Sequence, residues 1–117
     1  MNAEALAELG ELDKTAWDAT IKPIRDRAGF TLASALEFPE GASKDKLIEI
    51  VRNERRSELA LEGHRHKDII RWRIADNVLN GWCHGLKTND VVGTDDGYVR
   101  VENRTFNANK HYLWPIP

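Results

Sequence analysis

The chain has 117 residues, of which 41% are apolar and 31% are charged, and its formal net charge is −2. This composition is typical of a globular domain with a modest core, and the near-neutral charge excludes strong electrostatic attraction to nucleic acid or to an anionic membrane. The single cysteine, Cys83, excludes an internal disulfide and a thiolate zinc cluster.

The N-terminus has neither the basic segment nor the apolar core of a signal peptide. No apolar run approaches the roughly 20 residues that cross a bilayer as a helix. We therefore expect any export signal to lie on a preceding part of a longer protein. The chain is expected to begin inside a helix, because its first residues are already helical in character.

The N-terminal residues are predicted to form a helical hairpin. The first helix covers residues 2–9, and Gly10 fits the position after it, where glycine adopts the left-handed conformation without strain. Thr15 and Asp18 make an imperfect capping pair for the second helix. Pro23 is expected to kink that helix or to delay its start, because proline lacks an amide hydrogen.

Two further helices are predicted after a loop over residues 30–43. Ser43 is a good N-cap for the first of them. Apolar residues at helical spacing continue this helix to about Glu62, and Gly63 is expected to break it. The next helix is predicted to run from about His64 to Val78.

The composition changes at about Asn80, where glycine, asparagine and aspartate predict loops and turns. Tyr98–Glu102 alternates as a short strand, and Arg104–Phe106 is its candidate partner. The tail over residues 110–117 is apolar and contains two prolines, and its aromatic residues favour packing. The sequence thus predicts a mainly α fold with a small β-hairpin or irregular C-terminal segment.

The densest polar stretch lies in the middle of the chain. Three of its glutamates, Glu54, Glu58 and Glu62, recur every four residues and share one helix face. Arg55 and Arg65 stand three positions from Glu58 and Glu62, an offset that allows ion pairs. Two interpretations stay open, a solvated charged face and a partly buried network that fixes how two helices cross. The second predicts that Glu58 and Arg65 are charge-paired and more than half buried.

Chemical roles for the same stretch fit poorly. Glu54 and Glu58 could be the paired carboxylates of a glycosidase. They would project in parallel from one helix, however, and could not easily flank a sugar from opposite sides. The metal-ligand candidates are Glu62, His64, His66 and Asp68. The two histidines are two positions apart and point to different helix faces. The basic residues alternate with acids, which cancels the field that nucleic acid requires. We therefore expect no catalytic residue, no metal site and no cofactor.

Aromatic residues are the candidates for ligand contact, since flat rings support sugars when polar groups fix the sugar's orientation. Trp17 and Trp72 stand at helical spacing and are expected in the core, and Trp114 is expected to anchor the tail. Trp82 and Tyr98 remain as weak ligand-binding candidates, although packing is the commoner role for such a tryptophan. Because they fall in a predicted mobile loop, we expect this chain to bind no oligosaccharide tighter than millimolar.

The polar stretch resembles the signature near the end of SusD/RagB proteins. The residues that carry this resemblance are Glu54, Arg55, Glu58, Glu62, His64, Arg65, Asp68, Arg71 and Trp72. Three other stretches agree with the family in order, at residues 3–10, 21–29 and 111–117. The resemblance covers nearly the whole chain and is least specific over residues 80–100.

The resemblance implies the C-terminal portion of a mostly helical protein of several hundred residues, with helix pairs resembling tetratricopeptide hairpins. Such proteins are lipid-anchored on the outer face of the outer membrane of Bacteroidetes. They bind glycans, or in some cases peptides, beside a SusC-like TonB-dependent transporter. The resemblance therefore implies that the full-length protein has the transporter and a glycan or peptide as partners and does not bind nucleic acid. It implies contact with the membrane only through a lipid anchor, which is absent from this chain. The signature carries over as scaffold, and no glycan contact carries over.

We expect a single domain over residues 1–117. Its parts are a helical hairpin at 1–29, signature helices at 44–78, and a loop, short hairpin and Pro-Ile-Pro tail at 79–117. One alternative function stays open, a stand-alone helical protein-interaction module without a ligand of its own.

Overall fold

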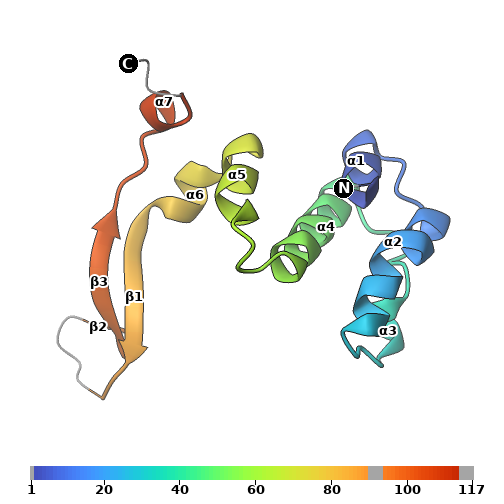
Figure 1. The fold of residues 1–117 in the computed structure, drawn as a ribbon, viewed down its shortest axis with the longest axis horizontal. Helices are drawn as coiled ribbons and strands as arrows, with labels where there is room; N and C mark the ends of the chain where they lie inside the picture. The colour runs from blue at the N-terminus through green and yellow to red at the C-terminus, as the bar shows by residue number, and fades with distance from the viewer. Residues whose placement is uncertain (1, 90–93, 114–117) are drawn as a thin grey trace. The chain divides into compact units, whose positions relative to one another are not determined.

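The structure, a computed structural model, describes residues 2–89 and 94–113 and is mainly helical with a small antiparallel sheet (Figure 1). The predicted fold class is therefore confirmed. The chain divides into two compact units, and the boundary between them in the sequence falls between Gly63 and His64. Over the described residues, no helix combines the length and the apolar character that a membrane span requires.

The described part of the first unit consists of helices that pack around one core. These are α1 (Asn2–Leu9), α2 (Lys14–Arg27), α3 (Ala33–Leu36) and α4 (Lys44–Glu58) (Figure 1). The first helix packs against α2 and α4, and α2 packs against α3 and α4. Trp17 is 1% exposed and lies in this core with Ala7, Leu12, Ile21 and Val51. The core position expected for Trp17 is confirmed.

The helix ends follow from local capping chemistry. Ser43 caps α4 as predicted, and its hydroxyl accepts a hydrogen bond from the amide of Lys46 at 3.2 Å. The predicted cap of α2 is wrong, because Asp13 accepts from the amide of Ala16 at 2.8 Å and the helix starts earlier. Pro23 lies inside α2 and does not delay its start.

The predicted end of α4 at Glu62 is also wrong. The helix ends at Glu58, and Leu61 and Gly63 then have φ values of +66° and +75°. Leu61 is fully exposed, so no core contact holds a further helical turn in place. The predicted loop over residues 30–43 contains the short helix α3.

The second unit contains short helices that precede and follow a sheet along the chain. Its described elements are α5 (His64–Arg71), α6 (Ala75–Leu79), β1 (Gly81–Lys87), β2 (Thr94–Asp95), β3 (Tyr98–Arg104) and α7 (Ala108–His111) (Figure 1). The single helix predicted over residues 64–78 is broken at Arg73, where φ is +53°. The amides of Arg73 and Ile74 donate to the carbonyls of Ile70 and Ile69, both at 3.1 Å. This pattern is a Schellman helix end.

The strand order in the sheet is β1-β3-β2, with both pairings antiparallel. The strand predicted at 98–102 is present, but the pairing predicted with Arg104–Phe106 is wrong. Its partners are β2 and β1, and the latter falls in a segment predicted as loop. Asp96 and Gly97 connect β2 to β3 with φ values of +50° and +83°, which fits a two-residue type I′ turn.

The described end of the chain packs through Tyr112. The Tyr112 hydroxyl accepts from the amides of Ala75 and Asp76 at 2.9 and 3.4 Å, and it donates to Asp76 Oδ1 at 2.7 Å. It therefore satisfies amide groups at the start of α6, where no local side chain forms a cap. The packing predicted for the tail is confirmed at Tyr112. The predicted anchor Trp114 and the Pro-Ile-Pro stretch lie outside the described residues.

Candidate functional site

Arg25 is the centre of a polar network in the first unit. Its Nε and Nη2 donate to Glu54 Oε2 at 2.9 and 2.7 Å, and its Nη1 donates to the carbonyl of Ala35. The guanidinium carbon lies 5.1 Å from the centroid of the Trp17 ring, and the Trp17 indole donates to the Leu36 carbonyl at 2.8 Å. Arg25 thus links α2 to α3 and α4.

A second arginine–glutamate pair joins the same two long helices. Arg27 on α2 pairs with Glu58 on α4. The side chains of Arg27 and Glu58 are 68% and 33% exposed, whereas those of Arg25 and Glu54 are each 16% exposed. Glu58 is therefore charge-paired, as predicted, and Arg65 is half-buried. The helices are joined by one largely buried pair and one that is open to solvent.

The remaining signature residues are also engaged within the protein. Asp68 is buried and accepts from Arg71 Nε at 2.9 Å. The Arg71 guanidinium carbon lies 4.8 Å from the centroid of the Trp72 ring, which is half-buried. The other members, Arg55, Glu62, His64 and Arg65, each take part in a polar or ring contact. In the described ranges, no three histidine, cysteine or acidic side chains form a group that could hold a metal ion.

Sequence reasoning missed Arg25 and Arg27 as the partners of the signature glutamates. The two arginines stand two positions apart in α2, about 30 residues before their partners, so no helical offset connects them. The signal present in the sequence was the family-like stretch over residues 21–29, which contains both. It resembled a helix of the family but did not indicate which glutamates the two arginines pair with.

Trp82 and Tyr98, the two ligand-binding candidates, lie on strands β1 and β3. The loop predicted around Trp82 is wrong, whereas Tyr98 lies in the strand that was predicted to begin there. Backbone pairing between β1 and β3 holds both residues. Trp82 is 45% exposed and Tyr98 is 43% exposed. Each ring has a cation over it: Arg100 lies 5.6 Å from the Trp82 centroid and Lys87 lies 5.4 Å from that of Tyr98.

A charged cluster lies beside these two rings. His84 Nε2 lies 2.8 Å from Asp95 Oδ2, and Arg100 donates to Asp95 Oδ1 through Nε at 3.0 Å and through Nη2. The hydrogen bonds from Arg100 and then from His84 hold the pKa of Asp95 well below its ordinary value. Asp95 is therefore a stable anion that fixes the positions of its two partners.

Strand pairing and ring contacts place these side chains together on the hairpin. His84 pairs with Arg100, Lys87 pairs with Tyr98, and Asp95 is also opposite Tyr98, and paired residues lie on the same side of a sheet. The register is irregular on either side of His84, so Trp82 is placed by Arg100, whose guanidinium lies over its ring. We call this surface the aromatic face; its members are Trp82, His84, Lys87, Asp95, Tyr98 and Arg100.

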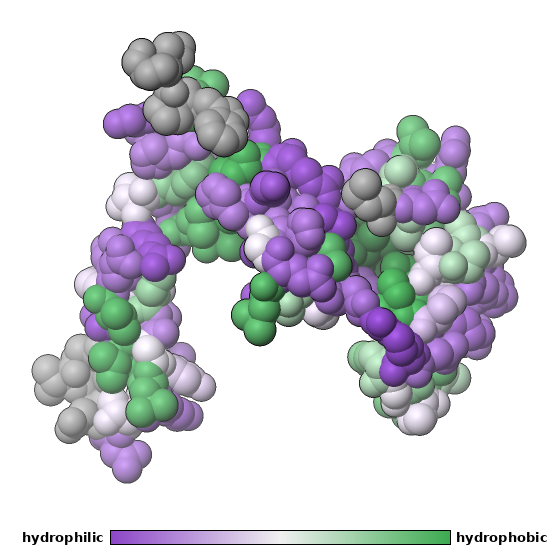
Figure 2. Space-filling model, in the orientation of Figure 1, coloured by the Kyte–Doolittle hydropathy of each residue, from purple (hydrophilic) through white to green (hydrophobic). Residues whose placement is uncertain are grey.

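Apolar side chains of the same strands are exposed as well. Val99 and Val101 alternate with the aromatic-face residues of β3 and are 38% and 67% exposed, and Leu86 of β1 is 85% exposed. A Cβ atom on Gly85 would come within 3.0 Å of Val101 Cγ2, so this glycine provides room for the valine. Figure 2 shows hydrophobic residues interspersed with hydrophilic ones over the hairpin.

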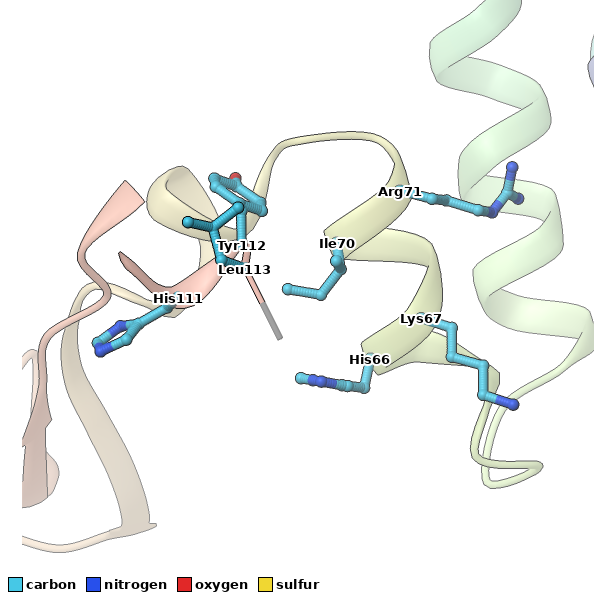
Figure 3. Close-up of a pocket in the computed structure, with 7 residues that line it drawn as sticks. All are labelled: His66, Lys67, Ile70, Arg71, His111, Tyr112 and Leu113. Carbon is cyan, nitrogen blue, oxygen red and sulfur yellow. The ribbon is translucent and has the colours of Figure 1, made fainter. Parts of the chain in front are cut away.

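A pocket of about 460 Å³ lies elsewhere in the second unit. It is lined by His66, Lys67, Ile70, Arg71, His111, Tyr112 and Leu113. In Figure 3, Ile70 and His66 point towards Tyr112 and Leu113, whereas Lys67 and Arg71 point away from them. Among the described residues the lining is therefore mainly apolar, and His66 points an imidazole into the pocket. Sequence reasoning missed the pocket because it depends on a packed tail.

Comparisons with known proteins agree on the family. A sequence model of the SusD family matches residues 1–117. A crystal structure of a SusD-like protein from Bacteroides fragilis matches 95% of this chain with a TM-score of 0.68 and 28% identity. The chain spans 19% of that neighbour's length. No curated protein sequence gives a significant match. Since the family match extends over every residue, the chain belongs to the SusD family.

Proposed function

We propose that this chain is the C-terminal scaffold region of a SusD-type nutrient-binding protein. The whole protein binds a glycan or peptide nutrient and works with a SusC-like TonB-dependent transporter at the outer face of the outer membrane. The observation that carries this proposal is the SusD family match over the full chain. The structural match to a SusD-like protein supports it independently.

The scaffold role is supported by the ion pairs that the charged signature residues form within the chain. Glu54 and Glu58 pair with arginines of α2, and Asp68 pairs with Arg71 next to the Trp72 ring. Charged groups that satisfy one another within a helical bundle hold helices in place and leave little hydrogen-bonding capacity for a ligand. These contacts support a framework role for the signature in the whole protein.

The same contacts support a binding role without turnover. A glycosidase needs two carboxyl groups that flank the scissile bond, one of which must act as an acid. Glu54 and Glu58 lie one turn apart on a single helix, and each is ion-paired. We therefore expect no hydrolysis when this chain is incubated with a glycan panel. Reproducible hydrolysis that is lost in Glu58→Gln would contradict the proposal.

The gene locus and a co-purification experiment test the proposal together. We expect the reading frame to be preceded by a lipoprotein signal and to lie beside a SusC-like transporter gene. The tagged full-length product should co-purify with that transporter from outer membranes in mild detergent. A promoter and start codon directly at Met1, with no co-purifying transporter, would instead favour a stand-alone interaction module.

A further inference from the structure

We propose that the aromatic face of the β1–β3 hairpin binds an acidic oligosaccharide built of uronic acid units. This inference rests on the proposed function, because it names a ligand class for a nutrient-binding protein. It adds a contact surface within the part of the chain that the family resemblance assigns to scaffold alone.

The two rings of the face lie along the hairpin with Arg100 between them. Arg100 lies 5.6 Å from the Trp82 ring centroid and stands two residues from Tyr98 in β3. A short oligosaccharide can therefore contact both aromatic side chains and the arginine between them. Because the strands hold both rings, binding does not have to order a mobile loop.

The polar groups of the face are mostly donors. Both oxygens of Asp95 are already engaged by His84 and Arg100. The donors that remain are Nη1 of Arg100, the ammonium of Lys87, the indole N–H of Trp82 and the hydroxyl of Tyr98. Within the described residues, these four groups make no hydrogen bond. A donor-rich surface with few open acceptors favours a ligand that supplies acceptors.

The charge of the face leads to the same ligand class. Lys87 and Arg100 contribute two positive charges against one negative charge on Asp95. Glu102 is balanced by Arg104, and Asp96 lies in the turn at the end of the strands. The surplus cation therefore lies beside the Tyr98 ring. A uronate carboxylate provides the matching anion and two acceptor oxygens on a sugar that can stack.

The affinity of this face alone should be weak. It is an open surface with half-exposed rings and not a cleft that encloses the sugar. We expect a dissociation constant of about 1 mM for a tetra-uronate. This value agrees with the expectation from the sequence that the chain binds no oligosaccharide tighter than millimolar. In a longer protein, the aromatic face would increase the affinity for a glycan that occupies it and a stronger site at the same time.

The test is a titration of the ¹⁵N-labelled 117-residue chain with tetragalacturonate, followed by NMR. The matched control ligand is its methyl ester, which keeps the sugar rings and removes the charge. We expect saturable shifts at the Trp82 indole and at the amides of β3, and at least tenfold weaker binding of the ester. No saturable shift, or equal binding of the two ligands, would refute the proposal. An acidic peptide that bound as tightly as the sugar would reassign the face to peptides and would also refute it.

Matched variants locate the site on the hairpin. Trp82→Ala and Lys87→Gln should each weaken binding at least threefold, while Val101→Thr, on the other side of β3, should leave it unchanged. The amide shifts of β3 report whether each variant keeps the hairpin folded. Binding that survives both Trp82→Ala and Lys87→Gln would place the site elsewhere. The co-purification with a transporter is independent of these variants, so failure here and failure of the proposed function are distinguishable.

Discussion

The contrast between the two arginine–glutamate pairs gives a sharp test of the scaffold. Glu54→Gln and Glu58→Gln make the same chemical change one helical turn apart on α4. Each removes the charge that faces an arginine of α2. The two sites differ mainly in burial, since the side chains of the first pair are 16% exposed and those of the second are 33% and 68% exposed.

The expected magnitudes follow from that difference. Breaking a buried ion pair costs about 3–5 kcal/mol, but glutamine can still accept one hydrogen bond and Arg25 keeps its contacts with Ala35 and Trp17. We therefore expect Glu54→Gln to lower the free energy of unfolding by about 2–3 kcal/mol. For Glu58→Gln we expect less than about 1 kcal/mol, the usual range for an exposed pair.

Thermal and urea unfolding, followed by far-ultraviolet circular dichroism, measure this difference. At about 4–8 °C per kcal/mol, Glu54→Gln should lower Tm by roughly 8–24 °C and Glu58→Gln by less than about 8 °C. High salt should reduce the smaller effect more than the larger one, because buried pairs are screened less. Equal losses in the two variants, or a loss below about 1 kcal/mol for Glu54→Gln, would refute the assignment of Arg25 as the centre of the network.

Three further outcomes concern the second unit. Tyr112→Phe should destabilise it by about 1–2 kcal/mol in urea unfolding, because two amides of α6 lose their acceptor; an unchanged midpoint would contradict this. Since the folded pKa of Asp95 lies below its ordinary value of 3.8, its contribution to stability is complete above that pH and is lost as pH falls towards the folded pKa. An NMR titration should find the Asp95 midpoint well below 3.8, and Arg100→Gln should raise it; a wild-type midpoint near 3.8 would argue against the cluster. Amides of β1 and β3 should exchange with deuterium faster than those of α2 and α4, because both strands are largely exposed; slower exchange in the strands would show that the hairpin is covered.

The sequence was sufficient at two helix ends that depend on local chemistry. Ser43 caps α4 and Gly10 ends α1 with φ of +79°, because capping and left-handed glycine depend on neighbouring residues only. The breaks at Leu61 and Arg73 were missed for the converse reason. Neither residue type signals a positive φ, so only the surrounding contacts decide that the helix stops there.

Strand β1 shows a second limit of sequence reasoning. Its glycines indicate a loop when the segment is considered alone. In the sheet, Gly85 makes room for Val101 of β3, and the register has irregularities on either side of His84. Those features have meaning only against the partner strand. The aromatic face could not be predicted for the same reason, although Trp82 and Tyr98 were candidates for ligand binding from the sequence.

The two units use charge in opposite ways, and this decides how substitutions should act. In the first unit, the glutamates of α4 are matched by arginines of α2, so a change there alters stability before it alters any surface. On the hairpin, Asp95 holds Arg100 and His84 in place while donors beside Trp82 and Tyr98 stay open to solvent. A change at Lys87 should therefore alter binding with little effect on unfolding. We propose that the signature forms the framework of this chain and that the less characteristic segment after it provides the surface that recognises a ligand.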